Sequence, residues 1–215
     1  MTEVVYPLWR QQLARSLHIN RSKVHSKYYQ VASVCSKGHP KNRTMVFRGF
    51  LSGTQSILSV TDLRSEKIEE WQGENKSRFE ICWYFTDSRE QFRLAGEVEL
   101  ISNGLNPSDR ERMLGKHNPQ SLLKQQWSNL STNARQPFSS NSPKAPYDEN
   151  LMPLTAQDEM VNQPNIAGNE FEISDNFCVV VFIPYTVDYL NLKSKPQQRC
   201  LYDIQDGWKE LTVNP

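Results

Sequence analysis

The fold class is decided by residues 91–101, which read QFRLAGEVELI. Apolar side chains recur at every second position, including Phe92, Leu94 and Val98, and polar or small residues lie between them. A period of two residues is typical of a β-strand with one buried and one solvated face. Clean alternation of this kind is common in antiparallel sheets. We therefore expect this segment to be a strand of an antiparallel sheet.

Further strand-like runs surround this segment, and short helical patterns separate them. We expect strands at residues 28–35, 43–51, 56–61, 79–85, 177–183, 187–192 and 198–204, with a closing segment at 207–213. We expect helices at residues 7–17, 64–71 and 119–130, and another that starts at Pro107. Turn residues at 37–40 join the first two strands as a hairpin. This order predicts a mainly β protein with flanking helices (α+β), built as one domain over residues 1–215 around a barrel-like meander.

Composition excludes several classes of function. The chain has 215 residues, 37% of them hydrophobic, and a formal net charge of +1. A general nucleic-acid binder would need a basic excess, so we expect no nucleic acid as a partner. The longest apolar run, near residues 177–184, is too short to cross a membrane, so we expect no membrane partner either. The first ten residues contain no signal-peptide pattern, which favours a cytoplasmic location.

The cysteines and histidines give no sign of a metal or disulfide site. The four cysteines are far apart and form no CxxC pair, so we expect reduced, buried thiols. The four histidines show none of the spacings that zinc or non-haem iron requires, and we expect no metal.

Residues 131–169 differ in composition from the rest of the chain. Ser, Asn, Pro, Gln and Lys dominate there, and five prolines interrupt any helix. We expect a long loop or partly disordered insertion, because such a composition buries little apolar surface.

Two arginines in residues 43–49 (RTMVFRG) are candidates for a binding role. Arg43 and Arg48 are five positions apart, so they fall on opposite faces of a regular strand and only one of them reaches a given cleft. The alternative interpretation is a pair of solvated charges.

Residues 61–67 (TDLRSEK) have the composition of a phosphate-binding turn. Thr61 ends an expected strand, and Ser65 and Lys67 lie in the first turn of an expected helix. Helix amides, a hydroxyl and an ammonium can hold a phosphate together. The alternative is a helix cap followed by a charged helix face.

Gln91 and Arg199 are the remaining polar candidates. The Gln91 amide could read the edge of a heterocycle through one donor and one acceptor. Arg199 begins the strand expected at residues 198–204. The alternatives are an exposed strand polar residue for Gln91 and an edge charge that discourages strand pairing for Arg199.

Taken in order, these segments resemble the pyridoxamine 5'-phosphate oxidase-like family of FMN-binding split barrels. The resemblance rests on residues 43–48 (RTMVFR), 61–67 (TDLRSEK), 89–96 (REQFRLAG) and 199–202 (RCLY). Residues 42–50 and 82–85 (CWYF) are similar to an FMN-dependent subfamily common in cyanobacteria. Four motifs in the family's order argue against a chance match. The resemblance covers the chain apart from the polar insertion.

The resemblance implies a six-stranded antiparallel split β-barrel that forms a homodimer, with FMN bound between the subunits. The implied activity is oxidation or reduction of a small-molecule substrate of unknown identity. Arg48 lies where the oxidases carry a lysine that faces cofactor and substrate, which implies a catalytic role. The implied cofactor-binding residues are Arg43, Thr44, Met45, Val46, Phe47, Arg48, Val60, Thr61, Ser65, Lys67, Gln91 and Arg199.

Three departures from the family pattern leave other functions open. Glu66 lies where the oxidases have an arginine near the flavin phosphate, and Leu190 lies where they have a cofactor-stacking tryptophan. Residues 195–197 (KPQ) replace a substrate-binding triplet. Because of these changes, two alternatives remain: a non-catalytic flavin-binding module, and a split barrel that has lost its flavin. A protein-interaction role through residues 131–169 is a third possibility.

Overall fold

The computed structural model describes residues 5–72, 78–103, 105, 117–146 and 172–215. Its strands are β1 (Tyr28–Val34), β2 (Pro40–Val46), β3 (Gly49–Phe50), β4 (Ile57–Asp62), β5 (Arg78–Phe85), β6 (Glu90–Ile101), β7 (Phe177–Asn191), β8 (Gln198–Asp203) and β9 (Leu211–Val213). Its helices are α1 (Leu8–Ile19), α2 (Glu66–Gln72), α3 (Pro119–Ser128), α4 (Thr132–Arg135) and the 3-10 turns η1 (Val24–Lys27) and η3 (Gln136–Ser139). The helix expected from Pro107 lies outside the described residues.

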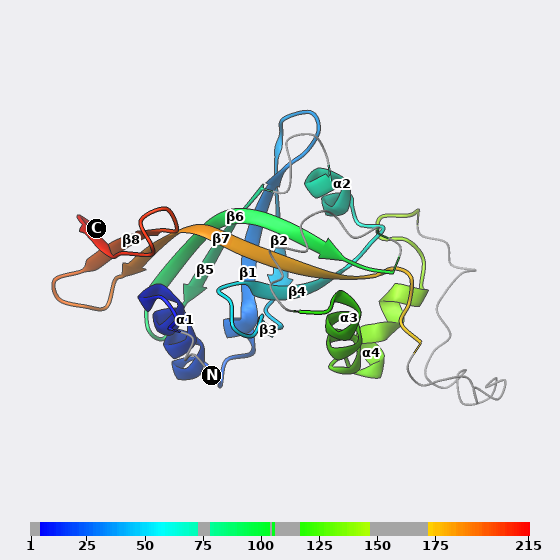
Figure 1. Ribbon diagram of the computed structural model, residues 1–215, viewed down its shortest axis with the longest axis horizontal. Helices are drawn as coiled ribbons and strands as arrows, with labels where there is room; N and C mark the ends of the chain where they lie inside the picture. Colours follow the sequence, from blue (N-terminus) through cyan, green and yellow to red (C-terminus); the bar gives the residue numbers. More distant parts are fainter. Residues whose placement is uncertain (1–4, 73–77, 104, 106–116, 147–171) are drawn as a thin grey trace.

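All these strands belong to one strongly curved antiparallel sheet (Figure 1). Strands β2, β1, β5, β6, β7 and β4 follow one another in that order, β3 extends the β4 edge, and β8 and β9 extend from β7. The two ends of the six-strand series approach each other, because the Arg48 amide donates to Leu58 O at 2.9 Å and Ser59 Oγ donates to Val46 O at 2.7 Å. The prediction of a mainly β split barrel with flanking helices is confirmed.

Strand β7 is a single strand of fifteen residues, although the sequence suggested two shorter runs. Its first part pairs with β4, its second part pairs with β8, and β6 follows it along the other edge. The register shifts at Gly96, opposite Pro184. A Cβ at Gly96 would lie 2.0 Å from Ile183 O, so only glycine fits at this irregularity.

Two hydrophobic clusters lie on the two faces of the sheet. The larger cluster fills the barrel and includes Trp9 and Leu13 of α1, Trp71 of α2 and the apolar face of β6. The smaller cluster joins α3 and η3 to the outer faces of β4 and β7. In it, Trp127, Phe138 and Phe177 contact one another edge to face. The alternation at Phe92, Leu94 and Val98 therefore marks the barrel interior, as predicted.

Glu90 anchors α1 to the barrel. Its buried carboxylate accepts hydrogen bonds from Ser16 at 2.7 Å and Tyr189 at 2.7 Å, and it pairs with Arg15 at 2.9 Å. Burial opposes ionisation of Glu90, but the bonds from Ser88, Tyr189 and Ser16 and the charge of Arg15 together hold its pKa below the ordinary value. A buried carboxylate with this many donors stays ionised and fixes the helix in place.

Several local predictions need correction. The strand expected over residues 43–51 begins at Pro40 and ends at Val46, and Gly49, at a φ of 124°, starts the separate strand β3. Part of the segment 131–169 is helical: α4 begins after Ser131, whose side chain caps it by accepting from the Ala134 amide. Residues 147–169 lie outside the described part.

The cysteines and the helices bear on two further predictions. All four cysteines are free, with Cys178 and Cys200 buried, but Cys35 and Cys82 are only half-buried. Within the described ranges, no helix is long and apolar enough to cross a membrane.

Candidate functional site

Arg43 points into the end of the barrel that α2 covers. Its guanidinium pairs with Glu70 of α2 at 2.5 Å and donates to Ser33 Oγ on β1, and the same Glu70 carboxylate also accepts from Ser33. The Glu70 side chain is only 5% exposed. Arg43 is therefore a structural partner of a buried carboxylate, whatever else it binds.

Lys67 lies beside this pair and is differently placed. Its ammonium donates to Thr61 Oγ1 at 2.9 Å. Within the described chain it forms no ion pair with a carboxylate. Burial lowers the pKa of Lys67 below its ordinary value, and the positive charge of Arg43 lowers it further, against the raising effects of Asp62 and Glu70. A half-buried ammonium with only a hydroxyl partner is suited to an incoming anion.

The turn from Thr61 to Lys67 has two sides. Thr61 and Lys67 face each other at the barrel end. Asp62 and Glu66 have other partners, because Asp62 binds Arg64 within the turn and Glu66 binds Lys144 at 2.5 Å. The Glu66 carboxylate, which the sequence placed where the oxidases have an arginine, is therefore neutralised by Lys144, which holds the pKa of Glu66 below its ordinary value.

Arg48 lines a cavity of about 530 Å³ on the outer face of β4, which we call the Arg48 cavity. Val60 and Asp62 form its floor, and Pro137, Phe138 and Ser140 form part of its wall. Arg48 is exposed, and over the described ranges its guanidinium has no hydrogen-bond or ion-pair partner. Arg43 and Arg48 thus face opposite ways, as their spacing predicted. A volume of this size is typical of small-molecule sites.

Gln91 and Arg199 lie together at a different place. Both residues flank Leu190, because Gln91 on β6 and Arg199 on β8 are its direct partners across β7. We call these three residues the β6–β8 row. All three are half-buried on the outer face of the sheet. Arg199 forms a bidentate pair with Asp188 at 3.0 and 2.7 Å.

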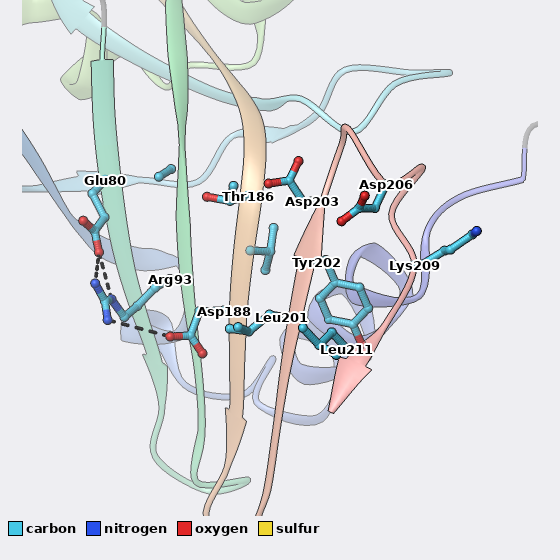
Figure 2. A pocket seen from close by; sticks show the side chains of 12 residues that line it. Glu80, Arg93, Thr186, Asp188, Leu201, Tyr202, Asp203, Asp206, Lys209 and Leu211 are labelled. Atoms are coloured by element: carbon cyan, nitrogen blue, oxygen red, sulfur yellow. Dashed lines mark hydrogen bonds and ion pairs between the residues drawn. The ribbon is translucent and has the colours of Figure 1, made fainter. Parts of the chain in front are cut away.

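A second cavity, of about 450 Å³, continues from this row along the same face (Figure 2). Figure 2 shows Arg93 between Glu80 and Asp188, with which it pairs at 2.5 and 3.7 Å. The cavity also carries Asp203, Asp206 and Lys209 near the end of the chain. Its central charges, Glu80, Arg93 and Asp188, pair with one another, whereas Lys209 is exposed and has no ion-pair partner among the described residues.

Lys67 and Thr61, which we call the Lys67 group, and the β6–β8 row lie at opposite ends of β7. Thr61 pairs with Cys178, whereas Gln91 and Arg199 pair with Leu190. These two positions of β7 are separated by about 40 Å of strand at the usual rise per residue. One chain therefore cannot bring both groups to a single small ligand.

The remaining predicted residues contribute mainly to the fold. Met45 is buried in the barrel, and Phe47 contacts Trp83 and Phe50. Thr44 is exposed and Val46 is half-buried, with its carbonyl bound to Ser59.

Sequence reasoning missed Glu70 and Lys144. Glu70 follows Arg43 by 27 residues and Lys144 follows Glu66 by 78, so neither pair leaves a local signal. Glu69 and Glu70 precede Trp71, and from the sequence alone both were interpreted as part of a solvated helix face.

Comparison with known proteins agrees with this architecture. A family model described as pyridoxamine 5'-phosphate oxidase, FMN-binding domain, matches residues 6–102. Pyridoxine/pyridoxamine 5'-phosphate oxidase 2 of Arabidopsis thaliana is 32% identical over 213 residues, which is 96% of each chain. A pyridoxamine 5'-phosphate oxidase-related, FMN binding protein of Nostoc punctiforme superposes with a TM-score of 0.80, at 35% identity, over 98% of this chain and 100% of that one.

A more distant structure supports the fold alone. PhzG of Burkholderia lata, solved with tetrahydrophenazine-1-carboxylic acid, superposes with a TM-score of 0.70 at 18% identity, over 99% of this chain and 98% of that one.

The chain therefore belongs to the pyridoxamine 5'-phosphate oxidase family of FMN-binding split barrels. FMN is the cofactor of this family. The resemblance seen in the sequence is confirmed.

The donor set of this chain fits FMN. The half-buried Lys67 ammonium, with only the Thr61 hydroxyl as its partner, suits a phosphate. The Arg48 cavity has the size for a small molecule and presents one free cation among mostly apolar walls. A free cation for the phosphate and a largely apolar cavity of this size are both features that a flavin nucleotide needs.

The Arg43–Glu70 pair yields a prediction about stability. Replacing Arg43 with Gln leaves the buried Glu70 carboxylate without its charged partner, so the unfolding free energy of the ligand-free protein should fall by about 2–4 kcal/mol. Urea denaturation measures this change.

Two further variants make the interpretation specific. Arg48→Gln, at an exposed arginine, should change stability by less than about 0.5 kcal/mol. The double variant Arg43→Gln/Glu70→Gln should be more stable than the sum of its single variants implies. Strict additivity would show that the pair is not coupled.

Proposed function

We propose that this protein is an FMN-dependent oxidoreductase that acts on a small-molecule substrate. The observation that carries the proposal is the half-buried Lys67 ammonium, whose hydrogen-bond partner is the Thr61 hydroxyl at the barrel end, while Arg48 lines a cavity on the opposite face of β4. When bound, FMN would supply the transfer of electrons to and from the substrate. The family's cofactor and the named relatives support the proposal.

Lys67, Ser65 and Thr61 would hold the phosphate. Lys67 supplies the charge, and the hydroxyls of Ser65 and Thr61 supply neutral hydrogen bonds. Glu66 does not oppose this role, because Lys144 neutralises its carboxylate. Arg43 adds positive potential, although Glu70 offsets much of it.

Binding of FMN should depend on pH through Lys67. The ligand-free ammonium has a lowered pKa, whereas a bound phosphate favours the charged form. As pH rises through the lowered pKa of Lys67, binding must take up a proton, and the affinity should fall by up to about tenfold per pH unit. Titration of FMN fluorescence between pH 7 and pH 10 measures this dependence.

Matched variants separate the contribution of the phosphate to FMN binding from that of the flavin ring. Lys67→Met should weaken FMN binding by about tenfold or more at pH 7 and flatten the pH dependence, while the affinity for riboflavin, which has no phosphate, should stay the same. Lys124→Met, at an exposed lysine of α3, should change nothing. If the wild-type protein retains much less than one FMN per chain after gel filtration, the proposal is wrong.

We also propose that the protein is a homodimer in which each FMN contacts both chains. The Lys67 group and the β6–β8 row lie about 40 Å apart along β7, which is longer than one FMN molecule. A two-fold dimer can bring the Lys67 group of one chain to the row of its partner.

Complementation between chains tests the shared site. Lys67→Met and the double variant Gln91→Ala/Arg199→Ala should each bind FMN poorly as pure proteins. A heterodimer of the two, isolated through different affinity tags, contains one wholly intact site and should hold about one FMN per dimer. Absorbance at the flavin maximum gives the stoichiometry. Heterodimers without FMN would contradict a shared site, and a 25 kDa species in sedimentation would contradict the dimer.

Arg48 is our proposed catalytic residue. A guanidinium stays protonated at any working pH, so it can act by stabilising developing negative charge but not as a base. Its position in the cavity and its lack of a partner among the described residues leave it free for that task.

Arg48→Ala should retain FMN and lower the rate of flavin reduction by about a hundredfold. Stopped-flow absorbance with panels of amine, nicotinamide and quinol donors measures that rate, and Arg48→Lys should restore part of it. An unchanged rate would remove Arg48 from catalysis. Bound FMN that no donor reduces would favour a non-catalytic flavin module instead.

The substrate class stays broad. The Arabidopsis relative is named for pyridoxine/pyridoxamine 5'-phosphate, which makes that compound the first to assay. Residues 195–197 lack the substrate triplet of the oxidases, so we do not favour it.

A further inference from the structure

We propose that Arg64 is a positioning residue, which holds residues 136–144 as the outer wall of the Arg48 cavity. We call residues 136–144 the strap. The inference rests on the proposed function, because it assigns the strap an effect on a ligand bound beside Arg48.

The Arg64 side chain binds the backbone carbonyls of the strap. The guanidinium donates from Nη1 to Ser140 O at 2.8 Å and from Nη2 to Pro137 O at 3.3 Å. Pro137 and Ser140 both line the Arg48 cavity. Arg64 thus sets the distance between the strap and β4.

Asp62 orients the guanidinium. It accepts from Arg64 Nε at 2.9 Å and from Nη2 at 2.6 Å, and it also accepts from the Arg64 backbone amide at 2.8 Å. A planar fork held on one edge by a carboxylate presents its other donors in a fixed direction. Only arginine has enough donors in one plane for both tasks.

The strap has a second, independent anchor at its base. Phe138 packs against Trp127 and Phe177, and its carbonyl accepts from Asn176 Nδ2 at 2.8 Å and from Ser174 Oγ at 3.1 Å. This anchor remains when Arg64 is replaced. Loss of Arg64 should therefore loosen the cavity wall without unfolding the hydrophobic cluster beneath it.

Glu66 provides a weaker third fastening through its pair with Lys144. Both side chains are more than half exposed, and exposed pairs contribute little. Asp62, Arg64 and Glu66 are alternate residues of the turn. Arg64 and Glu66 bind the strap, and Asp62 orients Arg64. Thr61 and Lys67 remain on the other side of the turn for the phosphate.

The strap matters to a ligand because it excludes water. Val60, Leu130 and Phe138 line the cavity around Arg48, which is open to solvent on one side, and an apolar wall that displaces water strengthens the interaction between the guanidinium and a negative charge. The site therefore favours a flat, largely apolar ligand with an anionic or electron-rich edge near Arg48.

Hydrogen exchange and FMN dissociation test the proposal with three variants. In Arg64→Ala, amides of residues 136–144 should exchange about tenfold faster in the ligand-free protein, because two charge-assisted bonds are lost. FMN should also dissociate about tenfold faster, and the visible circular dichroism of the bound flavin should change. Arg64→Lys, which can still reach one carbonyl, should fall between wild type and Arg64→Ala. Lys144→Met should change the dissociation rate by less than about threefold.

The matched control is Arg21→Ala, which removes an exposed arginine that bonds only within its own region, to His18 O. It should leave exchange and dissociation unchanged. Unaltered exchange in Arg64→Ala would overturn the anchoring role. Faster exchange with unaltered FMN dissociation and dichroism would overturn the positioning role while the proposed function stands. A wild-type protein that retains no FMN would overturn the proposed function and, with it, any role of Arg64 towards a ligand.

Discussion

The pairing of β7 is the constraint on which the rest of the structure depends. A strand of fifteen residues cannot stay flat in a twisted sheet, and this one bends where Gly96 of β6 lies against Ile183 and Pro184. On one side of the bend β7 pairs with β4, the last strand of the six-strand series, and on the other side it pairs with β8. The turn of residues 61–67, where we propose that the phosphate binds, lies at the end of β4, and Arg199 lies on β8, so one strand fixes both groups and keeps them apart.

This separation is the reason why we propose a flavin site that two chains share. The barrel interior is filled by aromatic side chains, and Tyr29, Trp83 and Phe182 leave no room there for a cofactor. A flavin ring must therefore lie outside this packed interior. In the dimer that we propose, a second copy would bring its half-buried β6–β8 row, which has suitable polar groups, to the Lys67 group.

The sequence predicts periodic features well and long-range polar contacts poorly. The alternation at Phe92, Leu94 and Val98 identified the barrel interior, because a period of two requires no knowledge of partners. The strand expected at residues 43–51 was too long, since the positive φ of Gly49 depends on how the chain turns into β3. The helical part of residues 131–146 was missed because its stability comes from one aromatic residue, Phe138, on a distant cluster. Four motifs in the right order identified the cofactor family, yet nothing local indicated that Glu70 would pair with Arg43.

Glu66 illustrates how the structure changes the meaning of a departure from a family pattern. In the sequence alone, a carboxylate in a phosphate-binding turn is expected to repel the ligand, which favours a protein that has lost its flavin. In the folded protein this carboxylate pairs with Lys144 and not with Lys67, and the positive charge of Lys144 offsets part of its repulsion of a phosphate. The same turn uses Asp62 and Arg64 to hold the neighbouring backbone. Asp62 and Glu66 therefore help to hold the strap along the Arg48 cavity. The replacement at Glu66 is compatible with FMN binding.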